Sequence, residues 1–271
     1  MSAVEDWRKQ VESHHAQTKA AIEKAGAAHA DLWSGLAEGF RDDPRRTGDP
    51  VVELISEWLT PQSTLIDVGG GAGRFALPLA LRCREVIVVE PSEAMQTALG
   101  ESMQGSGISN VSVVGEKWED AKVQPADVVL AAHVVYGVTD IAGFVHKMDE
   151  NSTKAAAVLI GTRAPLSRMS ALWEAARQEK RIDLPSLPEL LPVLWEMGIE
   201  PDVTMIDAPR PLHAHSMDAA LQMARHFLYI TAGSAEDTRL VAAAPALLEE
   251  SEAGVTTRGF SFRQAMVWWR K

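Results

Sequence analysis

A glycine-rich stretch early in the chain carries the residues best suited to bind a ligand. It reads LIDVGGGAGR from residue 65 to residue 74, so a short apolar run ends in Asp67 and is followed by four glycines, Gly69, Gly70, Gly71 and Gly73. Glycine has no Cβ atom, so this turn would leave the backbone open to a ligand. The N–H groups at the start of the helix predicted to follow would bind anionic or polar groups. The stretch therefore predicts a small-molecule site at a strand–helix turn.

A second acid stands at a spacing typical of nucleotide binding. Glu90 closes the next predicted strand, 21 residues after Gly69. In nucleotide-binding α/β folds, an acid near this distance accepts hydrogen bonds from the hydroxyls of a ribose. The two acids and the glycine turn together favour a nucleoside ligand.

Two kinds of nucleoside ligand compete for this arrangement. A dinucleotide site requires G-x-G-x-x-G/A, which Gly71, Gly73 and Ala76 can supply, with the pyrophosphate at the helix N-terminus. The pattern G-x-G-x-G on Gly69, Gly71 and Gly73 is simpler, and it places Asp67 two residues before the first glycine. Because a carboxylate so close would repel a pyrophosphate, the second pattern favours a ligand with a cationic amino group or a sulfonium.

Four segments in this order resemble the motifs of class I S-adenosylmethionine-dependent methyltransferases. Asp67 and the glycines after it match the first motif, and Glu90 with Pro91 is similar to the second, whose acid binds the ribose. GEKWE at residues 115–119 resembles the segment that lies along the adenine. DVVLAAHVVY at residues 127–136 resembles the motif beside the methyl group. The resemblance implies S-adenosylmethionine as the cofactor and methyl transfer as the reaction.

The resemblance extends over about residues 49–163 and implies a set of site residues. The cofactor would be bound by Asp67, Gly69, Gly70, Gly71, Gly73, Glu90, Pro91, Glu116, Lys117, Trp118, Ala132 and His133. The family often has an Asp and a small residue where this chain has Glu116, Lys117 and Trp118, so the resemblance leaves open which of the three borders the adenine. The ring of Trp118 is suited to stacking on the base.

His133 and Tyr136 are the candidate catalytic residues. Both follow the fourth predicted strand, at the edge where ligands bind in open α/β sheets. A general base would assist a hydroxyl acceptor and is dispensable for an amine or thiol that is already deprotonated. A hydrogen-bonded role inside a core loop fits both residues as well as a catalytic one. His213 and His215 have no nearby Cys or acid pair, so they predict no metal site.

These segments lie within a regular alternation of predicted strands and helices. The strands are continuously apolar, as expected where helices cover both faces of a parallel sheet. They cover residues 64–68, 85–89, 111–114, 127–131 and 155–160, with later candidates at 203–206 and 260–269. Asp49, Ser92 and Asp140 are suited to cap the helices that follow them. The pattern predicts an α/β fold with a doubly wound, mostly parallel seven-stranded sheet, which is the Rossmann-like fold that the resemblance implies.

Helical patterns outside this alternation cover residues 3–40, 167–181, 217–230 and 234–250. We therefore expect a single methyltransferase-like domain over residues 1–271. Its parts would be an N-terminal helical cap (1–48), a cofactor-binding core (49–165) and a C-terminal half with helical insertions (166–271). Additions to a shared scaffold usually carry substrate specificity. Their Trp, Leu, Met and Phe content predicts an apolar pocket and a small organic methyl acceptor.

The charge balance limits the partners of the chain. There are 26 Lys and Arg against 37 Asp and Glu, a net charge of −11. Phosphate binding needs clustered cations, so no nucleic-acid partner is expected, although a local basic groove is compatible with this balance. Cys83 is the single cysteine, which excludes a disulfide framework. The charged start and the lack of an apolar run of ~20 residues predict a cytoplasmic protein with no membrane partner.

Two other functions are compatible with the same residues. One is an oxidoreductase that uses NAD(P) or another nucleotide, since the glycine turn and Glu90 also occur in such sites. The other is a non-catalytic module that binds S-adenosylmethionine without transferring its methyl group. Neither the methyl acceptor nor the oligomeric state follows from the sequence.

Overall fold

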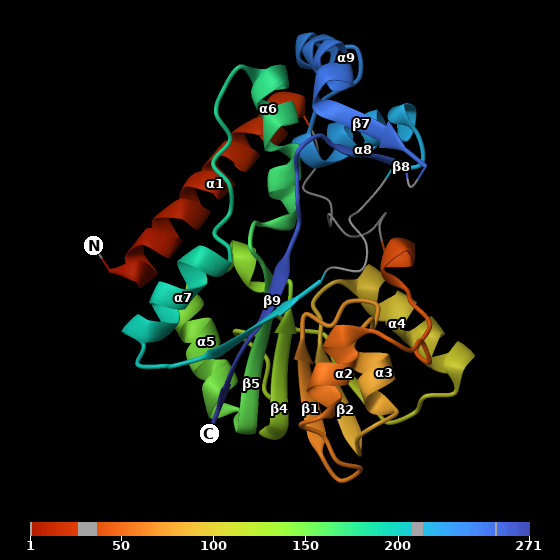
Figure 1. Cartoon of the computed structure of the whole chain (residues 1–271), viewed down its shortest axis with the longest axis vertical. Helices are drawn as coiled ribbons and strands as arrows, with labels where there is room; N and C mark the ends of the chain where they lie inside the picture. Colours follow the sequence, from red (N-terminus) through yellow and green to blue (C-terminus); the bar gives the residue numbers. More distant parts are fainter. Residues whose placement is uncertain (1, 27–36, 208–213, 253) are drawn as a thin grey trace.

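A seven-stranded sheet forms the centre of the computed structural model, which describes residues 2–26, 37–207, 214–252 and 254–271 (Figure 1). The strand order is β3-β2-β1-β4-β5-β9-β6. The bounds are β1 (Thr64–Val68), β2 (Glu85–Val89), β3 (Val111–Val114), β4 (Ala126–Ala132), β5 (Ser152–Gly161), β6 (Asp202–Ile206) and β9 (Gln264–Arg270). The first five strands pair in parallel, and β9 lies antiparallel between β5 and β6. The predicted doubly wound, mostly parallel seven-stranded sheet is confirmed.

Helices cover both faces of this sheet, which explains the continuously apolar strands. One face carries α2 (Pro50–Ser56), α3 (Ala76–Ala80) and α4 (Glu93–Ser106), and the other carries α1 (Ala3–Ala25), α5 (Ile141–Glu150) and α7 (Leu187–Glu196). Successive residues of β1 enter different cores: Leu65 packs with α2 and α3, whereas Ile66 packs with α5 and α7. Because side chains alternate along a strand, burial on both faces requires an apolar residue at every position.

A third apolar cluster lies beyond the carboxyl ends of β4 and β5, at the top of Figure 1. It contains η3 (Pro165–Met169), α6 (Ser170–Arg177), α8 (Met217–Leu228), α9 (Ala235–Leu247) and a hairpin of β7 (Leu248–Ser251) and β8 (Gly254–Thr257). We call this unit the cap. Trp173, which is 1% exposed, is its largest fully buried side chain.

The predicted helix over residues 234–250 is wrong at its end. α9 stops at Leu247 and residues 248–251 form β7, because buried Leu248 adopts extended backbone and pairs with Thr257 of β8. The helix predicted over residues 167–181 is also shorter. It begins as the 3-10 helix η3 and ends at Arg177, where Gln178 takes the left-handed conformation.

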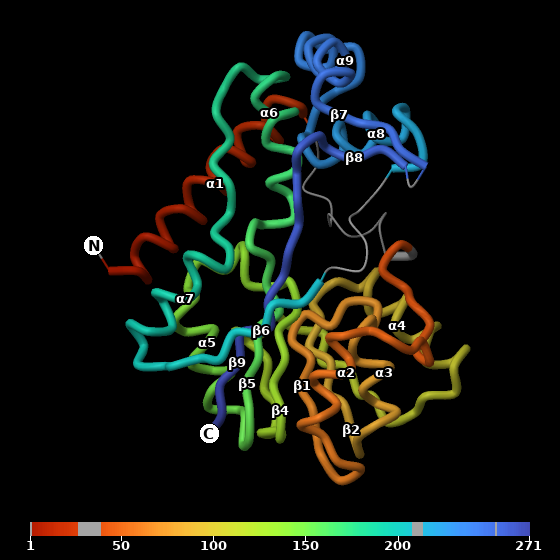
Figure 2. Tube along the Cα trace, viewed as in Figure 1, coloured from red at the N-terminus to blue at the C-terminus, as the bar shows by residue number. Residues whose placement is uncertain are grey.

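α1 links the sheet to the cap (Figure 2). Trp7 and Val11 pack in the core beside α7, and Ala21 near the other end belongs to the cluster of the cap. The helix predicted over residues 3–40 ends earlier, at Ala25, because Gly26 adopts a left-handed φ of 61° and closes the helix. Residues 27–36 of that prediction lie outside the described residues, and η1 (Ala37–Phe40) follows them.

The predicted helix caps are confirmed. The side chains of Asp49, Ser92 and Asp140 accept hydrogen bonds from backbone N–H groups in the first turns of α2, α4 and α5. Each cap follows a connecting loop and fixes where its helix begins. In the described part of the chain, no helix combines the length and the apolar character needed to cross a bilayer.

Candidate functional site

The strand order brings the predicted site residues to one edge of the sheet. β3, β2, β1 and β4 are neighbours in that order, and all four run in parallel. Their carboxyl ends carry Glu116, Glu90, Asp67 and His133, each within two residues of the last residue of its strand. Segments spread over some seventy residues of sequence therefore meet at the place where open α/β sheets bind ligands.

Asp67 is a buried carboxylate at the end of β1. It is 1% exposed, and no described N–H or O–H group reaches either carboxylate oxygen in hydrogen-bonding geometry. Burial raises the pKa of Asp67 to about 7, and repulsion from Glu90 adds to the rise. The backbone N–H of Ala76 lowers the pKa by a smaller amount, although it does not form a hydrogen bond of normal geometry with the carboxylate. A buried charge without a partner is costly, so Asp67 is poised to interact with a cation.

Glu90 connects the end of β2 to the glycine turn. Its Oε2 accepts the N–H of Gly71 at 3.0 Å, and its Oε1 accepts the N–H of Ser92 at 2.9 Å. Glu90 is 7% exposed, so these bonds form in a largely dry environment. A carboxylate accepts up to about four hydrogen bonds, so bracing the turn and binding a ribose hydroxyl are compatible roles.

The glycines of the turn serve two different purposes. A Cβ atom on Gly69 would lie 2.6 Å from the side chain of Val134, and one on Gly73 would lie 2.5 Å from Leu99. These two glycines are required by the packing of the protein itself rather than by a ligand. A Cβ atom on Gly71 would meet nothing nearer than the sulfur of Met95 at 3.8 Å, although its φ of 55° favours glycine. The sequence predicts an accessible backbone over the whole turn, whereas in the structure only Gly71 among these four glycines has free space beside its Cα atom.

The third predicted segment divides into exposed and buried residues. Glu116 and Lys117 are exposed, as is Pro91 after β2. Trp118 is 3% exposed, and its indole N–H donates to the carbonyl of Phe144 in α5 at 3.2 Å. The interpretation that Trp118 stacks on a base is corrected by this placement, because its ring is enclosed in the core. Glu116 and Lys117 are the members of the trio that face solvent.

His133 and Tyr136 belong to a closed hydrogen-bond chain. The hydroxyl of Tyr136 accepts the N–H of Gly161 at 2.7 Å and lies 2.9 Å from Nδ1 of His133. Nε2 of His133 lies 3.0 Å from Oε1 of Gln264, an acceptor, so this nitrogen carries the proton and Nδ1 accepts from Tyr136. In the order Gly161 to Tyr136 to His133 to Gln264, these bonds give both ring nitrogens of His133 and the hydroxyl of Tyr136 a partner.

This series of hydrogen bonds favours a structural role for His133 and Tyr136 over the predicted catalytic one. Burial lowers the pKa of His133 to about 4, and the charge of Arg74 lowers it further, while the bond to Gln264 raises it. Burial raises the pKa of Tyr136 above its usual value. A neutral His with both nitrogens bonded and a Tyr that holds its proton cannot abstract a proton without breaking the chain. His133 also has a φ of 60°, a strained conformation that the chain stabilises.

Gln264 is a site residue that sequence reasoning missed. It is 4% exposed and begins β9, 131 residues after His133. The only local signal is a polar residue at the edge of an apolar strand pattern.

Two other predicted residues remain to be placed. Ala132 is the last residue of β4, pairs with Leu159 and is half-buried. His213 lies outside the described residues, so its predicted lack of a metal role is not tested.

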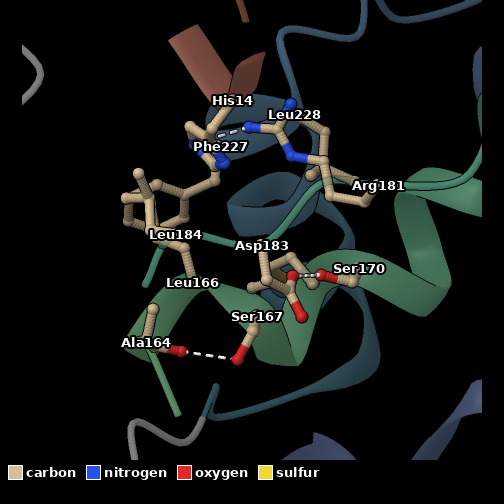
Figure 3. Close-up of a pocket in the computed structure, with 11 residues that line it drawn as sticks. His14, Ala164, Leu166, Ser167, Ser170, Arg181, Asp183, Leu184, Phe227 and Leu228 are labelled. Atoms are coloured by element: carbon tan, nitrogen blue, oxygen red, sulfur yellow. Dashed lines mark hydrogen bonds between the residues drawn. The ribbon is translucent and has the colours of Figure 1, made fainter. Parts of the chain in front are cut away.

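A narrow cavity between α1 and the cap has room for about one water molecule (Figure 3). Nδ1 of His14 donates to the carbonyl of Ile182 at 2.6 Å, and its Nε2 accepts from Arg181 at 2.8 Å. Burial lowers the pKa of His14 to about 4, and the charge of Arg181 acts in the same direction. Small-molecule sites usually enclose some hundreds of Å³, so this cavity between α1 and the cap is too small for an organic acceptor.

Comparison with known proteins assigns most of this architecture to one family model. A model described as a methyltransferase domain matches residues 40–202. Among curated proteins, the chain is 32% identical over 111 residues to a ribosomal RNA small subunit methyltransferase G of Corynebacterium efficiens, covering 38% of this chain and 48% of that protein. The chain spans less than two thirds of the curated relatives it matches, 63% of the first and 48% of the second.

Two solved structures share the fold at low sequence identity. A SAM-dependent methyltransferase of Thiobacillus denitrificans in complex with S-adenosyl-L-homocysteine has a TM-score of 0.51 and 12% identity, over 89% of this chain and 96% of that one. The [4+2]-cyclase SpnF has a TM-score of 0.56 and 15% identity, over 89% of this chain and 92% of that one. At such identities the similarity shows the fold alone.

We expect Asp67 to make stability fall as pH rises. The folded protein holds the Asp67 proton up to about pH 7, whereas the unfolded chain releases it near pH 4, so the folded state loses stability between these values. Asp67→Asn removes this titration. The difference in the free energy of unfolding, variant minus wild type, should therefore rise by up to about 4 kcal/mol between pH 4 and pH 8. Urea denaturation across this range measures the difference.

Asp140→Asn is the matched control, because Asp140 is an exposed helix cap. Its difference from the wild type should not change with pH in the same way. A pH-independent difference for Asp67→Asn would show that Asp67 titrates normally in the folded protein.

We expect Tyr136→Phe to destabilise the fold rather than to remove a base. The variant leaves the Gly161 N–H and Nδ1 of His133 without their shared partner, at a cost of about 1–3 kcal/mol in the free energy of unfolding. Tyr229→Phe is the control, since no hydrogen bond of the Tyr229 hydroxyl is found among the described residues, and the chain has two tyrosines. Equal stability of both variants in chemical denaturation would contradict the role of the chain of hydrogen bonds.

Proposed function

The chain belongs to the methyltransferase domain family, and we propose that it transfers the methyl group of S-adenosylmethionine to a small organic acceptor. The observation that carries the proposal is the buried, unpartnered carboxylate of Asp67 beside the open backbone of Gly71. When bound, S-adenosylmethionine supplies an activated methyl group on a positively charged sulfonium. The family model and the Thiobacillus denitrificans structure with S-adenosyl-L-homocysteine support this choice of cofactor.

The charge of the turn favours a cationic ligand. Asp67 lies beneath Gly70, whose Cβ position would be 2.9 Å from the Asp67 Oδ2 atom. Because both oxygens are buried, Asp67 acts on a ligand through its field across the turn rather than by direct contact. The low polarity around it strengthens that field. A pyrophosphate would be repelled at the same place, which disfavours the oxidoreductase alternative.

Glu90 is suited to bind the ribose. Its carboxylate is already oriented by the amides of Gly71 and Ser92, so it offers acceptors to ribose hydroxyls without first losing side-chain freedom. Glu116 and Lys117, exposed at the end of the neighbouring strand, are the proposed neighbours of the adenine. Ala132 and the αL turn at His133 would border the methyl end.

The hydrogen-bond chain at β4 bears on the type of acceptor. Since His133 and Tyr136 are both engaged, they offer no general base at this end of the sheet. Holding an acceptor in line with the methyl group supplies on the order of 7–11 kcal/mol without proton transfer. The site therefore favours an acceptor whose attacking atom is already deprotonated, such as an amine, a thiolate or a carboxylate.

The cap is the proposed source of acceptor specificity. β5 leads directly into η3 and α6 of the cap, so the cap stands over the carboxyl edge of the sheet (Figure 1). Its apolar cluster is distinct from those of the sheet and fits a recognition unit added to a common core. RNA is the second candidate acceptor, because one curated relative is an rRNA methyltransferase. The net charge of −11 argues against RNA binding.

We expect Glu90→Ala to lower the affinity for S-adenosylhomocysteine about 10- to 100-fold. The variant removes the hydrogen bonds to the ribose and the brace on Gly71, and bonds to a charged group contribute about 1.5–3 kcal/mol. Titration calorimetry measures the affinity, with circular dichroism to show that the fold is intact. Glu93→Gln, exposed in the first turn of α4, is the control. A wild type that binds NADH and not S-adenosylhomocysteine would overturn the assignment.

Transfer of a radiolabelled methyl group tests the acceptor. We expect label from S-adenosylmethionine in a small amine, thiol or carboxylic acid from a panel, with none in total RNA. Because SpnF shares the fold and is a cyclase, the test must detect the transferred methyl group itself. Label in RNA alone would overturn the small-molecule acceptor. Binding of S-adenosylmethionine without transfer of label to any of the small molecules or to RNA would favour the non-catalytic module.

A further inference from the structure

Lys147 of α5 binds the loop that follows β3 in an unusual way. Its Nζ donates to the carbonyls of Trp118 at 2.5 Å, Glu119 at 3.1 Å and Ala121 at 2.7 Å. An ammonium group has three protons. All three are thus directed to one stretch of four residues, 26 to 29 positions earlier in the chain.

We propose that Lys147 is a positioning residue that holds Glu116 and Lys117 in place to recognise the adenine of the cofactor. This inference rests on the proposed function, since it assumes that these two residues face the base. It assigns a role to a lysine that touches neither cofactor nor acceptor. We call residues 115–121 the adenine loop.

Trp118 completes the attachment of the adenine loop to α5. The ammonium of Lys147 lies 4.8 Å from the centre of the Trp118 ring, within the range of a cation–π interaction. The indole N–H donates to the carbonyl of Phe144, and the Trp118 and Phe144 rings are 6.3 Å apart. One side chain of the loop and three of its carbonyls are therefore fixed to a single helix.

The other end of the adenine loop is fixed to β2. A Cβ atom on Gly115 would lie 3.1 Å from the side-chain amide of Gln96, so the loop passes close to α4 there. That amide donates to the carbonyl of Glu90 at 2.7 Å, and the N–H of Glu90 donates to the carbonyl of Val114 at 3.0 Å. The start of the loop is thereby tied to the acid proposed to bind the ribose.

Glu116 and Lys117 lie between these two attachments. Both side chains are exposed, while the carbonyl of Lys117 accepts the N–H groups of Asp120 at 3.0 Å and Ala121 at 2.9 Å. The loop thus turns back on itself and presents the pair at the sheet edge. Fixing the backbone of a flexible residue costs conformational entropy. The attachment to Lys147 meets this cost before any ligand binds, which favours binding in the fixed geometry.

A comparison of two ligands tests the role of Lys147. Lys147→Met keeps the aliphatic stem and removes the three donors. We expect its affinity for S-adenosylhomocysteine to fall about 10-fold, and its preference for this ligand over S-inosylhomocysteine, which differs only in the base, to fall toward unity. Lys154→Met, which breaks an exposed ion pair of β5 with Asp127, is the control and should keep the preference. Calorimetry well below the melting temperature measures both affinities.

Hydrogen exchange of the wild type keeps the inference testable if Lys147→Met does not fold. The amides of Asp120 and Ala121 should be protected without ligand. Protection that appears only on adding S-adenosylhomocysteine would overturn the inference, as would a Lys147→Met variant that is less stable but keeps its base preference. A wild type that does not bind S-adenosylhomocysteine at all would instead overturn the proposed function.

Discussion

The site depends on a carboxylate that the protein buries without giving it a partner. Asp67 stands at the end of the central strand β1, and burial raises its pKa to about 7. Most buried acids are paired or hydrogen-bonded, because the desolvation of a charge is costly. Among the described residues, no group forms a hydrogen bond of normal geometry with the Asp67 carboxylate, so its charge can act on the space above the glycine turn. The buried charge destabilises the ligand-free protein and favours the binding of a cation at the turn. A sulfonium ligand carries such a positive charge.

The residues around Asp67 are held in place by contacts that need no ligand. Glu90 is oriented by two backbone amides, and it braces Gly71. Gly69 and Gly73 allow close packing against Val134 and Leu99. At the end of β4, the hydrogen bonds from Tyr136 through His133 to Gln264 stabilise the left-handed conformation of His133. The cofactor half of the site is therefore preorganised, whereas the acceptor half depends on the cap.

Local patterns are enough to predict most of the elements and to bring the two acids of the proposed cofactor site to one sheet edge. The strands were visible because both faces of a parallel sheet are buried, and the caps Asp49, Ser92 and Asp140 because they act within one helical turn. The β7–β8 hairpin was missed because its register depends on the packing of Leu248 in the cap. Trp118 was misplaced since its exposed neighbours in sequence gave no sign of the contact with Phe144, 26 residues away.

The roles of His133 and Lys147 also depend on contacts between residues far apart in the sequence, which local patterns do not reveal. A histidine at a strand end is compatible with catalysis or with structure, and the choice depends on Gln264, 131 residues along the chain. Because both ring nitrogens are bonded, we expect the histidine to have a structural role and to stay neutral. The loop that follows β3 is likewise fixed by a lysine on a later helix. The loops proposed to contact the ribose and the adenine are held by contacts within the protein. Neutralising Asp67 is then the main electrostatic change expected on cofactor binding, so affinity should depend more on the charge of the ligand than on ordering the protein.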